Sequence, residues 1–306
     1  QYGAKGDGIA DDTRALRKCF QKNLNVRLYG KYRIADSISI QTGQRIYGDN
    51  AEIIYKTTTG KLLTSFNAHS WQIDGKLTLS GSGNTEGTAI ALSITGGKNI
   101  QVSGLTITDI SGTGIALSEG VYLQRGNCAL MTNVSIVNSW KGLQTFKASE
   151  YHSFVNLNIV GCAYSAEIRS GNISLLGGNI VDNTYGLFIG GRYGTNNSHG
   201  IISGVNINHN KAYNLLCDSV QHGETFIGCH FFGQKTENII IRNSKAVSFV
   251  GGIIDGRVEI ADSSGYQYFN AIELGPSFNL YGFKERAIIS NSFYRDAGPY
   301  RKETEN

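Results

Sequence analysis

A four-residue segment, Gly104-Leu105-Thr106-Ile107, returns in related form six more times along the chain. The first residues of successive copies lie 29, 23, 21, 27, 24 and 23 positions apart. A repeat of this length is typical of a β-solenoid, in which each interval forms one turn and neighbouring turns supply the core. The later copies are Asn133-Val134-Ser135-Ile136, Asn156-Leu157-Asn158-Ile159, Gly177-Gly178-Asn179-Ile180, Gly204-Val205-Asn206-Ile207, Gly228-Cys229-His230-Phe231 and Gly251-Gly252-Ile253-Ile254.

Polarity alternates within each copy, as it does in a half-buried strand. We expect the apolar fourth position to face inward and the polar third position to face outward. The fourth position is Ile107, Ile136, Ile159, Ile180, Ile207, Phe231 and Ile254. The third is Thr106, Ser135, Asn158, Asn179, Asn206 and His230 in the first six copies.

A second strand is expected about twelve residues after the first in each turn. Its inward column is predicted to be Ala116, Thr145, Ile168, Ile189, Leu216 and Ile240. The two longest intervals predict loops near 119–126 and 190–200, where function tends to concentrate. The fold predicted is an all-β, single-stranded right-handed parallel β-helix with coils of about 21–29 residues. A two-layer antiparallel sandwich is the rival fold, but it does not explain a fixed interval with isoleucines in register.

Composition supports strands and excludes several classes of function. The 306 residues include 39 Gly and only 2 Pro, and 17% are charged. The formal net charge of +4 is not gathered into a basic stripe, so no nucleic-acid partner is expected. No apolar run is long enough to span a membrane, so no membrane insertion is expected. The five Cys include no CxxC pair and are expected to be free thiols. The chain begins at Gln1 without a signal peptide, and we expect a mature or trimmed fragment.

The N-terminal segment is predicted to close one end of the solenoid. Glycines in Tyr2-Gly3-Ala4-Lys5-Gly6-Asp7-Gly8 permit tight turns, and Asp12 is expected to N-cap a helix over 13–21. One face of this helix carries Ala15, Leu16, Cys19 and Phe20. A plug of this kind would cover strand edges that a solenoid otherwise exposes.

This opening, with Asp11-Asp12-Thr13 after it, resembles the start of the pectate-lyase-like superfamily, which includes bacteriophage tailspikes and depolymerases. The segments 26–34 and 44–49 look like the first coils of that family. The resemblance implies a capping region at 1–30, a parallel β-helix at 31–275 and an irregular, truncated C-terminal segment at 276–306. It also implies a homotrimer in a virion tail that attaches to a host cell and acts on a bacterial polysaccharide. A secreted protein is the alternative location.

Catalytic motifs of the family are absent. The chain lacks the Asn-Thr-Asp, mid-helix Asp-Asp, Gly-His-Gly and Arg-x-Lys motifs of polygalacturonases, and the Asp-Pro-His signature of mannuronan epimerases. Ser198-His199-Gly200 is only a partial match, and Asp11-Asp12 lies in the cap. No catalytic residue is therefore carried over from the family.

A candidate site follows instead from the predicted columns, because equivalent residues of adjacent coils lie about 5 Å apart. Glycoside hydrolysis needs paired carboxylates, and a uronate lyase needs a base beside a cation. The second strand offers two outward columns of this kind, with aromatic rings beside the charges. The first holds Gln144, Glu167 and Phe188, and the second holds Phe146, Arg169 and Gly190, with Lys147, Arg192 and Asp218 near them. A solvated surface ion pair is the structural alternative.

Two smaller clusters complete the candidates. His199 is predicted to approach His222 and Glu224 of the next coil, where a polar turn is the alternative. Asp182 and His209 share a turn column with Asp109 and Asn138, where a backbone role is the stronger interpretation. The predicted catalytic residues are Glu167, Arg169, Asp182, Asp218 and Glu224. The predicted substrate-binding residues are Phe146, Lys147, Phe188, Arg192, His199 and His222. Neither a metal site nor a cofactor is expected.

The function expected is that of a tailspike-like depolymerase, which cleaves a capsule or O-antigen polysaccharide as a glycosidase or as a lyase. A glycan-binding adhesin without catalysis uses the same fold and the same aromatic and polar contacts. A structural phage fibre without a glycan site is the third possibility. The sequence does not separate these three.

Overall fold

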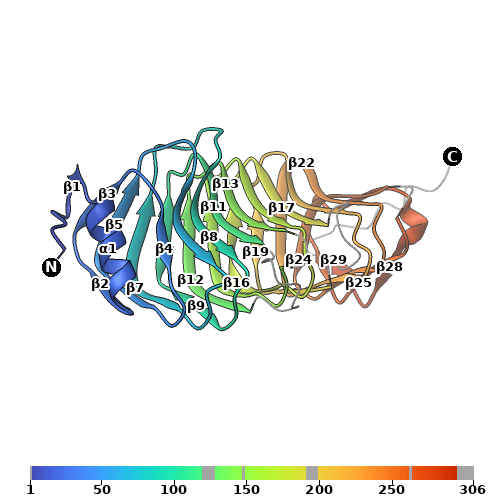
Figure 1. Ribbon diagram of the computed structural model, residues 1–306. Helices are drawn as coiled ribbons and strands as arrows, with labels where there is room; N and C mark the ends of the chain where they lie inside the picture. The colour runs from blue at the N-terminus through green and yellow to red at the C-terminus, as the bar shows by residue number, and fades with distance from the viewer. Residues whose placement is uncertain (1, 119–127, 147–148, 191–198, 262–263, 295–306) are drawn as a thin grey trace.

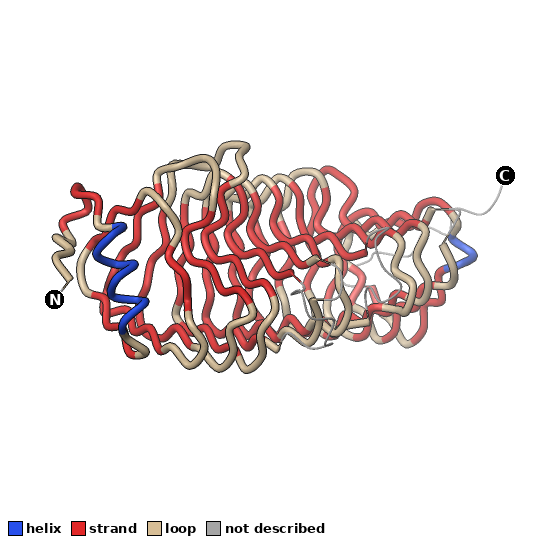
Figure 2. Tube along the Cα trace, in the orientation of Figure 1, coloured by secondary structure: helices blue, strands red, loops and turns tan. Residues whose placement is uncertain are grey.

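The computed structural model is a right-handed parallel β-helix of about 11 turns of roughly 23 residues, as predicted (Figure 1). The structure describes residues 2–118, 128–146, 149–190, 199–261 and 264–294. All strand pairings between the described coils are parallel, and the strands form three stacks that run along the solenoid axis (Figure 2).

Each coil contributes one strand segment to each stack, in the order 1, 2, 3. Stack 1 contains β2 (Asn25–Leu28), β9 (Ile100–Ser103), β18 (Ile201–Ser203), β21 (Glu224–Ile227), β23 (Val247–Val250), β25 (Gln267–Asn270) and β28 (Ala287–Ser290). Stack 2 contains β1 (Asp7–Asp11), β3 (Lys31–Ile34), β10 (Leu105–Thr108), β19 (Asn206–Asn208), β26 (Glu273–Leu274) and β29 (Phe293–Tyr294). Stack 3 contains β4 (Ile38–Ile40), β6 (Lys61–Phe66), β8 (Ala89–Thr95), β11 (Gly112–Ser118), β13 (Lys141–Thr145), β15 (Tyr164–Ile168), β17 (Tyr185–Gly190), β20 (Tyr213–Asp218) and β27 (Asn279–Gly282).

Seven longer strands bend through a corner and belong to two stacks. Stacks 1 and 2 share β5 (Arg45–Tyr55), β7 (Gln72–Ser80), β12 (Ala129–Val137), β14 (Ser153–Val160) and β16 (Ser174–Val181). Stacks 2 and 3 share β22 (His230–Arg242) and β24 (Ile253–Ile260).

The corner between stacks 1 and 2 explains why each repeat begins with Gly or Asn. The corner residue has a positive φ, for example 70° at Gly104, 52° at Asn133 and 66° at Gly177. Gly adopts this left-handed conformation without steric penalty, and Asn tolerates it better than most residues. The chain therefore turns sharply at a single residue before the second strand starts.

The predicted isoleucine column is confirmed. Ile107, Ile136, Ile159, Ile180, Ile207, Phe231 and Ile254 pair in register along stack 2, and each is at most 1% exposed. The polar third column is also in register on the outer face, where Asn158, Asn179 and Asn206 form an amide ladder.

The predicted inward column of the second strand, which belongs to stack 3, is wrong at three positions. Thr145, Ile168 and Ile189 do face inward, but their partners are Leu117, Cys217 and Ile241. Ala116, Leu216 and Ile240 lie one residue earlier, in the column of Glu167. The error arose because this outer column itself contains apolar residues, which hides the period-two alternation.

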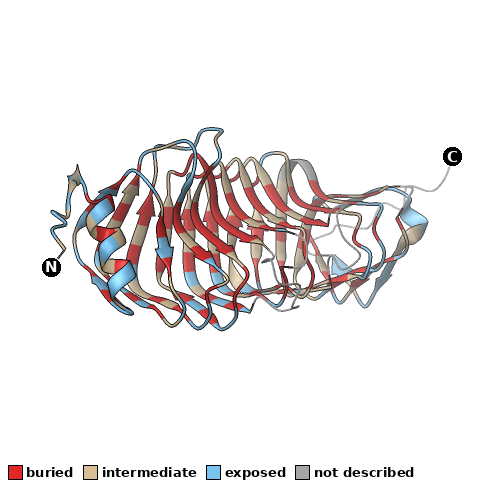
Figure 3. Ribbon diagram, in the orientation of Figure 1, coloured by how far each residue is buried: buried red, intermediate tan, exposed pale blue. Residues whose placement is uncertain are grey.

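Helix α1 (Thr13–Lys22) covers the N-terminal end of the solenoid (Figures 1 and 3). Leu16 and Phe20 are buried in the core, and Cys19 packs against it. Asp12 occupies the N-cap position but makes no capping bond, contrary to prediction. Its carboxylate accepts hydrogen bonds from the backbone of Lys5 (2.7 Å) and Gly6 (3.0 Å), and so fixes the preceding glycine-rich loop.

The coils extend beyond the expected limits of the solenoid on both sides. On the N-terminal side, β2 and β3 both pair with β5, so the first coil begins before residue 31. On the C-terminal side, β27, β28 and β29 continue the three stacks past residue 275, with one 3-10 turn at Lys284–Arg286. The part of 276–306 that the structure describes is therefore not irregular. The predicted loops near 119–126 and 190–200 lie mostly outside the described residues.

Candidate functional site

The outer face of stack 3 brings together the charged and aromatic residues predicted from the second strand. Gln144, Glu167 and Phe188 pair in register on β13, β15 and β17, as predicted. Arg169 follows Glu167 on the same side, and its guanidinium lies 4.8 Å from the centre of the Phe188 ring. Phe146 is 39% exposed at the end of β13.

Glu167 is the centre of this group. Its Oε2 accepts a hydrogen bond from the Gln144 amide, and lies 3.5 Å from Lys141 Nζ and 3.9 Å from Arg169 Nε. The side chain is 14% exposed, compared with 28% for Lys141 and 31% for Arg169. The carboxylate is therefore held in a partly buried position between two cations that themselves reach solvent.

A row of tyrosines runs beside this group and was missed in the sequence. Tyr164, Tyr185 and Tyr213 pair in register with Lys141 in the column at the start of each strand. Neighbouring rings lie 4.7 Å and 5.7 Å apart, and the Trp140 ring packs 5.6 Å from Tyr164. Their recurrence at the interval of the coils was the signal that could have revealed them.

The first two rings of the tyrosine row do not offer open faces to solvent. The rings of Tyr164 and Tyr185 are nearly parallel, with 14° between their planes, so they cover each other. Burial raises the pKa of the Tyr164 and Tyr213 hydroxyls further above neutral pH, so both are protonated there. A protonated phenol both donates and accepts hydrogen bonds, which suits the hydroxyl groups of a sugar.

A loop from an earlier coil borders the row. Asn84, in the connection between β7 and β8, donates a hydrogen bond to the carbonyl of Gly161 at 2.8 Å. The nearby charge of Glu86 contributes to the raised pKa of Tyr164. Residues 81–88 therefore reach across the intervening coils and form a rim beside Trp140 and Tyr164.

Asp218 supplies a second carboxylate on the same face. It is in register with Gly190, two coils from Glu167, which corresponds to roughly 10 Å along the axis. Burial opposes its ionisation, but hydrogen bonds from Asn243 and Ser219 and the Arg242 guanidinium at 2.9 Å outweigh this, and its pKa is lowered. Asp218 is therefore an anion at neutral pH, which can accept hydrogen bonds from a bound ligand.

The predicted histidine cluster also assembles, but its carboxyl group is inside the solenoid. The rings of His199 and His222 meet edge to face at 5.7 Å. Glu224 is 4% exposed and accepts a hydrogen bond from the Gly200 backbone at 3.2 Å. Burial raises its pKa to about 8, so that it is largely protonated at neutral pH. A carboxyl group this deeply buried does not reach a polymer bound at the surface.

Asp182 and His209 occupy one turn column, as predicted, with φ values of 58° and 54°. Asp109 and Asn138 have the same left-handed conformation, which supports the backbone role for this column. Lys147 and Arg192, predicted to bind substrate, lie outside the described residues. Among the described residues, no group of three His, Cys, Asp or Glu side chains is arranged to hold a metal ion. No described helix has the length and apolar character needed to cross a membrane.

Comparison with solved structures confirms the fold. No protein-family model and no curated protein sequence matches the chain. The A-module of mannuronan C-5 epimerase AlgE6 from Azotobacter vinelandii aligns with a TM-score of 0.65 and 14% identity, over 97% of this chain and 98% of that one. Polygalacturonase from Erwinia carotovora aligns with a TM-score of 0.59 and 13% identity, over 94% of both chains. The enzymatically active domain of bacteriophage CBA120 tailspike protein 2 aligns with a TM-score of 0.51 and 14% identity, over 95% of this chain but 44% of that one. The chain thus has the fold of pectate-lyase-like right-handed β-helices.

Proposed function

We propose that this protein binds a bacterial surface polysaccharide along the outer face of stack 3 and cleaves it beside Glu167. The observation that carries the proposal is the set of groups around that carboxylate, in which Lys141 and Arg169 flank Glu167 and the tyrosine row runs parallel to the solenoid axis. An extended glycan is a linear ligand, and a column of repeated hydroxyl groups matches a repeating row of sugar hydroxyls.

Two chemistries fit these residues. In a lyase, Lys141 and Arg169 would stabilise the carboxylate of a uronic acid while Glu167 takes the proton beside it. In a hydrolase, Glu167 and Asp218 would act as the carboxyl pair on either side of the scissile bond. The two residues are two coils apart along the axis and two positions apart along the strand, so their Cα atoms lie roughly 12 Å apart. The hydrolase therefore requires the side chains to lean toward each other to reach the separation of about 6.5–9.5 Å between carboxyl groups of an inverting enzyme.

The fold neighbours support a polysaccharide as the substrate class. Mannuronan epimerase and polygalacturonase are named for polysaccharide substrates, and the tailspike domain is described as enzymatically active. On the same basis we propose that the chain is part of a virion tail and serves in host attachment.

Incubation with a panel of capsular and O-antigen polysaccharides tests the activity. New reducing ends accompanied by the ultraviolet absorbance of an unsaturated uronate identify a lyase, and new reducing ends without it identify a hydrolase. Glu167→Gln keeps the size of the side chain and should reduce turnover by at least about a hundredfold, with binding retained. Glu259→Gln is the matched control, because Glu259, on β24, lies on the same outer face of stack 3 as Glu167. Equal turnover in Glu167→Gln and the wild-type protein would contradict the role of Glu167.

One observation favours a binding protein without catalysis. The Glu167 carboxylate is already engaged by Gln144, Lys141 and Arg169, an arrangement that also serves to order a binding surface. A polysaccharide that is bound but not cleaved by the wild-type protein would support this adhesin function.

We propose a homotrimer that assembles through an uncharged surface on stacks 1 and 2. In the six coils from β12 to β23, the outward positions of stack 1 contain no Asp, Glu, Lys or Arg, and the adjoining positions of stack 2 from β10 to β22 contain none either. The surface spans roughly 29 Å by 25 Å, and in a closed trimer it is divided between the two neighbouring chains. Its exposed apolar residues are Leu130, Val155, Leu176, Ile201, Ile227 and Val250.

A further inference from the structure

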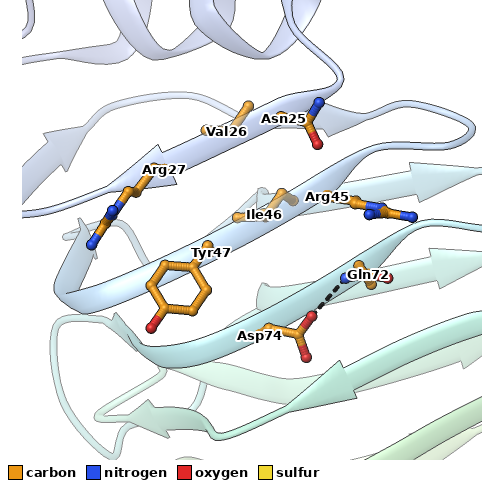
Figure 4. Close-up of a pocket in the computed structure, with 8 residues that line it drawn as sticks. All are labelled: Asn25, Val26, Arg27, Arg45, Ile46, Tyr47, Gln72 and Asp74. Atoms are coloured by element: carbon orange, nitrogen blue, oxygen red, sulfur yellow. Dashed lines mark hydrogen bonds between the residues drawn. The ribbon is translucent and has the colours of Figure 1, made fainter.

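In the first three coils the outer face of stack 1 is charged, unlike the uncharged face of the middle coils. Here the outward columns of β2, β5 and β7 carry charged and polar side chains that surround a shallow groove (Figure 4). Arg27, Tyr47 and Asp74 form one column in register, and Asn25, Arg45 and Gln72 form the other. None of these residues contributes to the face around Glu167, which lies three to five coils further along the solenoid and on another stack.

Tyr47 offers a ring surface in the middle of the groove. It is 47% exposed, and its ring is seen face-on between Arg27 and Asp74 in Figure 4. The ring rests against the backbone of the next coil, since a Cβ added to Gly75 would lie 3.1 Å from its Cε2 atom. The Arg27 guanidinium lies 5.4 Å from the ring centre and is fixed by Asp49 at 2.7 Å. Tyr47 is therefore held in place, and it differs from the mutually stacked tyrosines of stack 3.

Arg45 is a cation without a counter-ion inside the groove. No carboxylate of the described chain lies within ion-pairing distance of it, whereas Arg27 is already paired with Asp49. Arg45 and Tyr47 are two residues apart on β5, which separates them by about 6.8 Å, close to the width of a pyranose ring. In the next coil, Asp74 lies directly beside Tyr47; it receives one hydrogen bond from the Gln72 amide at 2.7 Å and retains acceptor capacity.

We propose that this groove is a separate saccharide-binding site, which takes one carboxylated sugar unit. The sugar ring stacks on Tyr47, its carboxylate pairs with Arg45, and its hydroxyls at the edge that borders the next coil donate hydrogen bonds to Asp74. The Arg45 guanidinium and the Asp74 carboxylate lie along different edges of the sugar and so give it a single orientation, because the carboxylate of a uronate matches only the guanidinium. Aromatic stacking and a partly exposed ion pair together predict weak binding of a single unit.

Saturation-transfer NMR with galacturonate and glucuronate, each beside its neutral parent galactose or glucose, tests the site. The wild-type protein should bind the uronates more tightly than the neutral sugars. Tyr47→Ala should weaken uronate binding by roughly three- to tenfold, and Arg45→Gln should reduce it to the level of the neutral parent. Tyr29→Ala and Arg14→Gln change exposed residues outside the groove and should leave binding unchanged.

Tyr185→Ala separates this proposal from the function proposed for stack 3. If Tyr185→Ala loses uronate binding and Tyr47→Ala keeps it, the sugar lies on stack 3 and the groove site is overturned. Equal binding of uronates and neutral sugars by the wild-type protein would also overturn it. Uronate binding that depends on Tyr47 and Arg45 would stand even if no polysaccharide were cleaved.

Discussion

Glu224 makes the stability of the solenoid depend on pH. Its carboxyl group is 4% exposed, and burial raises its pKa from 4.5 to about 8. The space that it occupies exists because the residue below it is Gly200, where an added Cβ would lie 2.9 Å from Glu224 Oε1. In the folded protein the group is therefore protonated at a pH at which the unfolded chain has already lost the proton.

The sign and size of the effect follow from proton linkage. The folded state binds more protons than the unfolded state between the two pKa values, so the free energy of unfolding falls as pH rises. The contribution is intact below the ordinary pKa of 4.5 and is lost as pH rises through about 8. Between about pH 5 and pH 8 the loss amounts to about 3 kcal/mol. In a chain of this size that is a decrease in Tm of roughly 5–10 °C.

Glu224→Gln isolates this contribution. Gln is neutral, similar in size and still able to accept the hydrogen bond from Gly200, so the variant should match the wild-type protein near pH 5. Near pH 8 it should be more stable by about 3 kcal/mol. Thermal unfolding of both proteins across this range, with the exposed Glu285→Gln as control, measures the difference. Parallel Tm curves for Glu224→Gln and the wild-type protein would refute the reasoning, because they would mean that Glu224 ionises without penalty in the folded state.

Two further predictions concern assembly and the corners of the coil. Leu176→Glu combined with Ile227→Glu places charges in the uncharged surface and should reduce the mass measured by light scattering from three chains to one. Ile9→Glu, at an exposed site elsewhere, should leave the mass unchanged. A wild-type protein that is already monomeric would contradict the proposed assembly. Gly178→Ala should destabilise the fold by about 2–4 kcal/mol, because its φ is 100° and a Cβ would lie 2.2 Å from the Leu157 carbonyl oxygen. Gly177→Ala has a φ of 66° and open space around the added Cβ, so it should lose only about 1–2 kcal/mol; equal losses of Tm in the two variants would show that crowding at Leu157 is unimportant.

The fold was readable from the sequence because its determinants are periodic. Each isoleucine from Ile107 to Ile207 performs the same task one coil further on, and each first Gly or Asn forms the same left-handed corner. Local pattern and global architecture therefore specify one structure. The prediction failed at Ala116, Leu216 and Ile240, where the outer column is also apolar and the pattern no longer distinguishes the two sides of a strand.

The candidate site was only partly readable for the same reason. The register of Gln144, Glu167 and Phe188 follows from the repeat, but Lys141 and the tyrosine row lie three residues earlier, where a cation and aromatic rings share one column and no single residue type marks it. The rim formed by Asn84 joins segments 77 residues apart, and the repeat does not predict such a contact. A buried amide ladder was equally hidden, because its bonds from Asn183 to Asn210 (2.9 Å) and from Asn214 to Asn238 (2.6 Å) depend on how each turn folds inward.

In the middle coils the outward charged residues of the strands are confined to stack 3, and this indicates whether one chain alone can form the proposed site. In the middle coils, the outward ionised residues of stack 3 include Lys141, Glu167, Arg169, Asp218 and Arg242, whereas the adjoining faces of stacks 1 and 2 have none. Burying charges against another copy would require their desolvation, which uncharged faces avoid. Assembly through stacks 1 and 2 would thus leave stack 3 in water, where a hydrated glycan can reach it. It follows that Leu176→Glu combined with Ile227→Glu should lose assembly but keep the affinity of each chain for a short oligosaccharide. Loss of both together would mean instead that neighbouring copies contribute to the site.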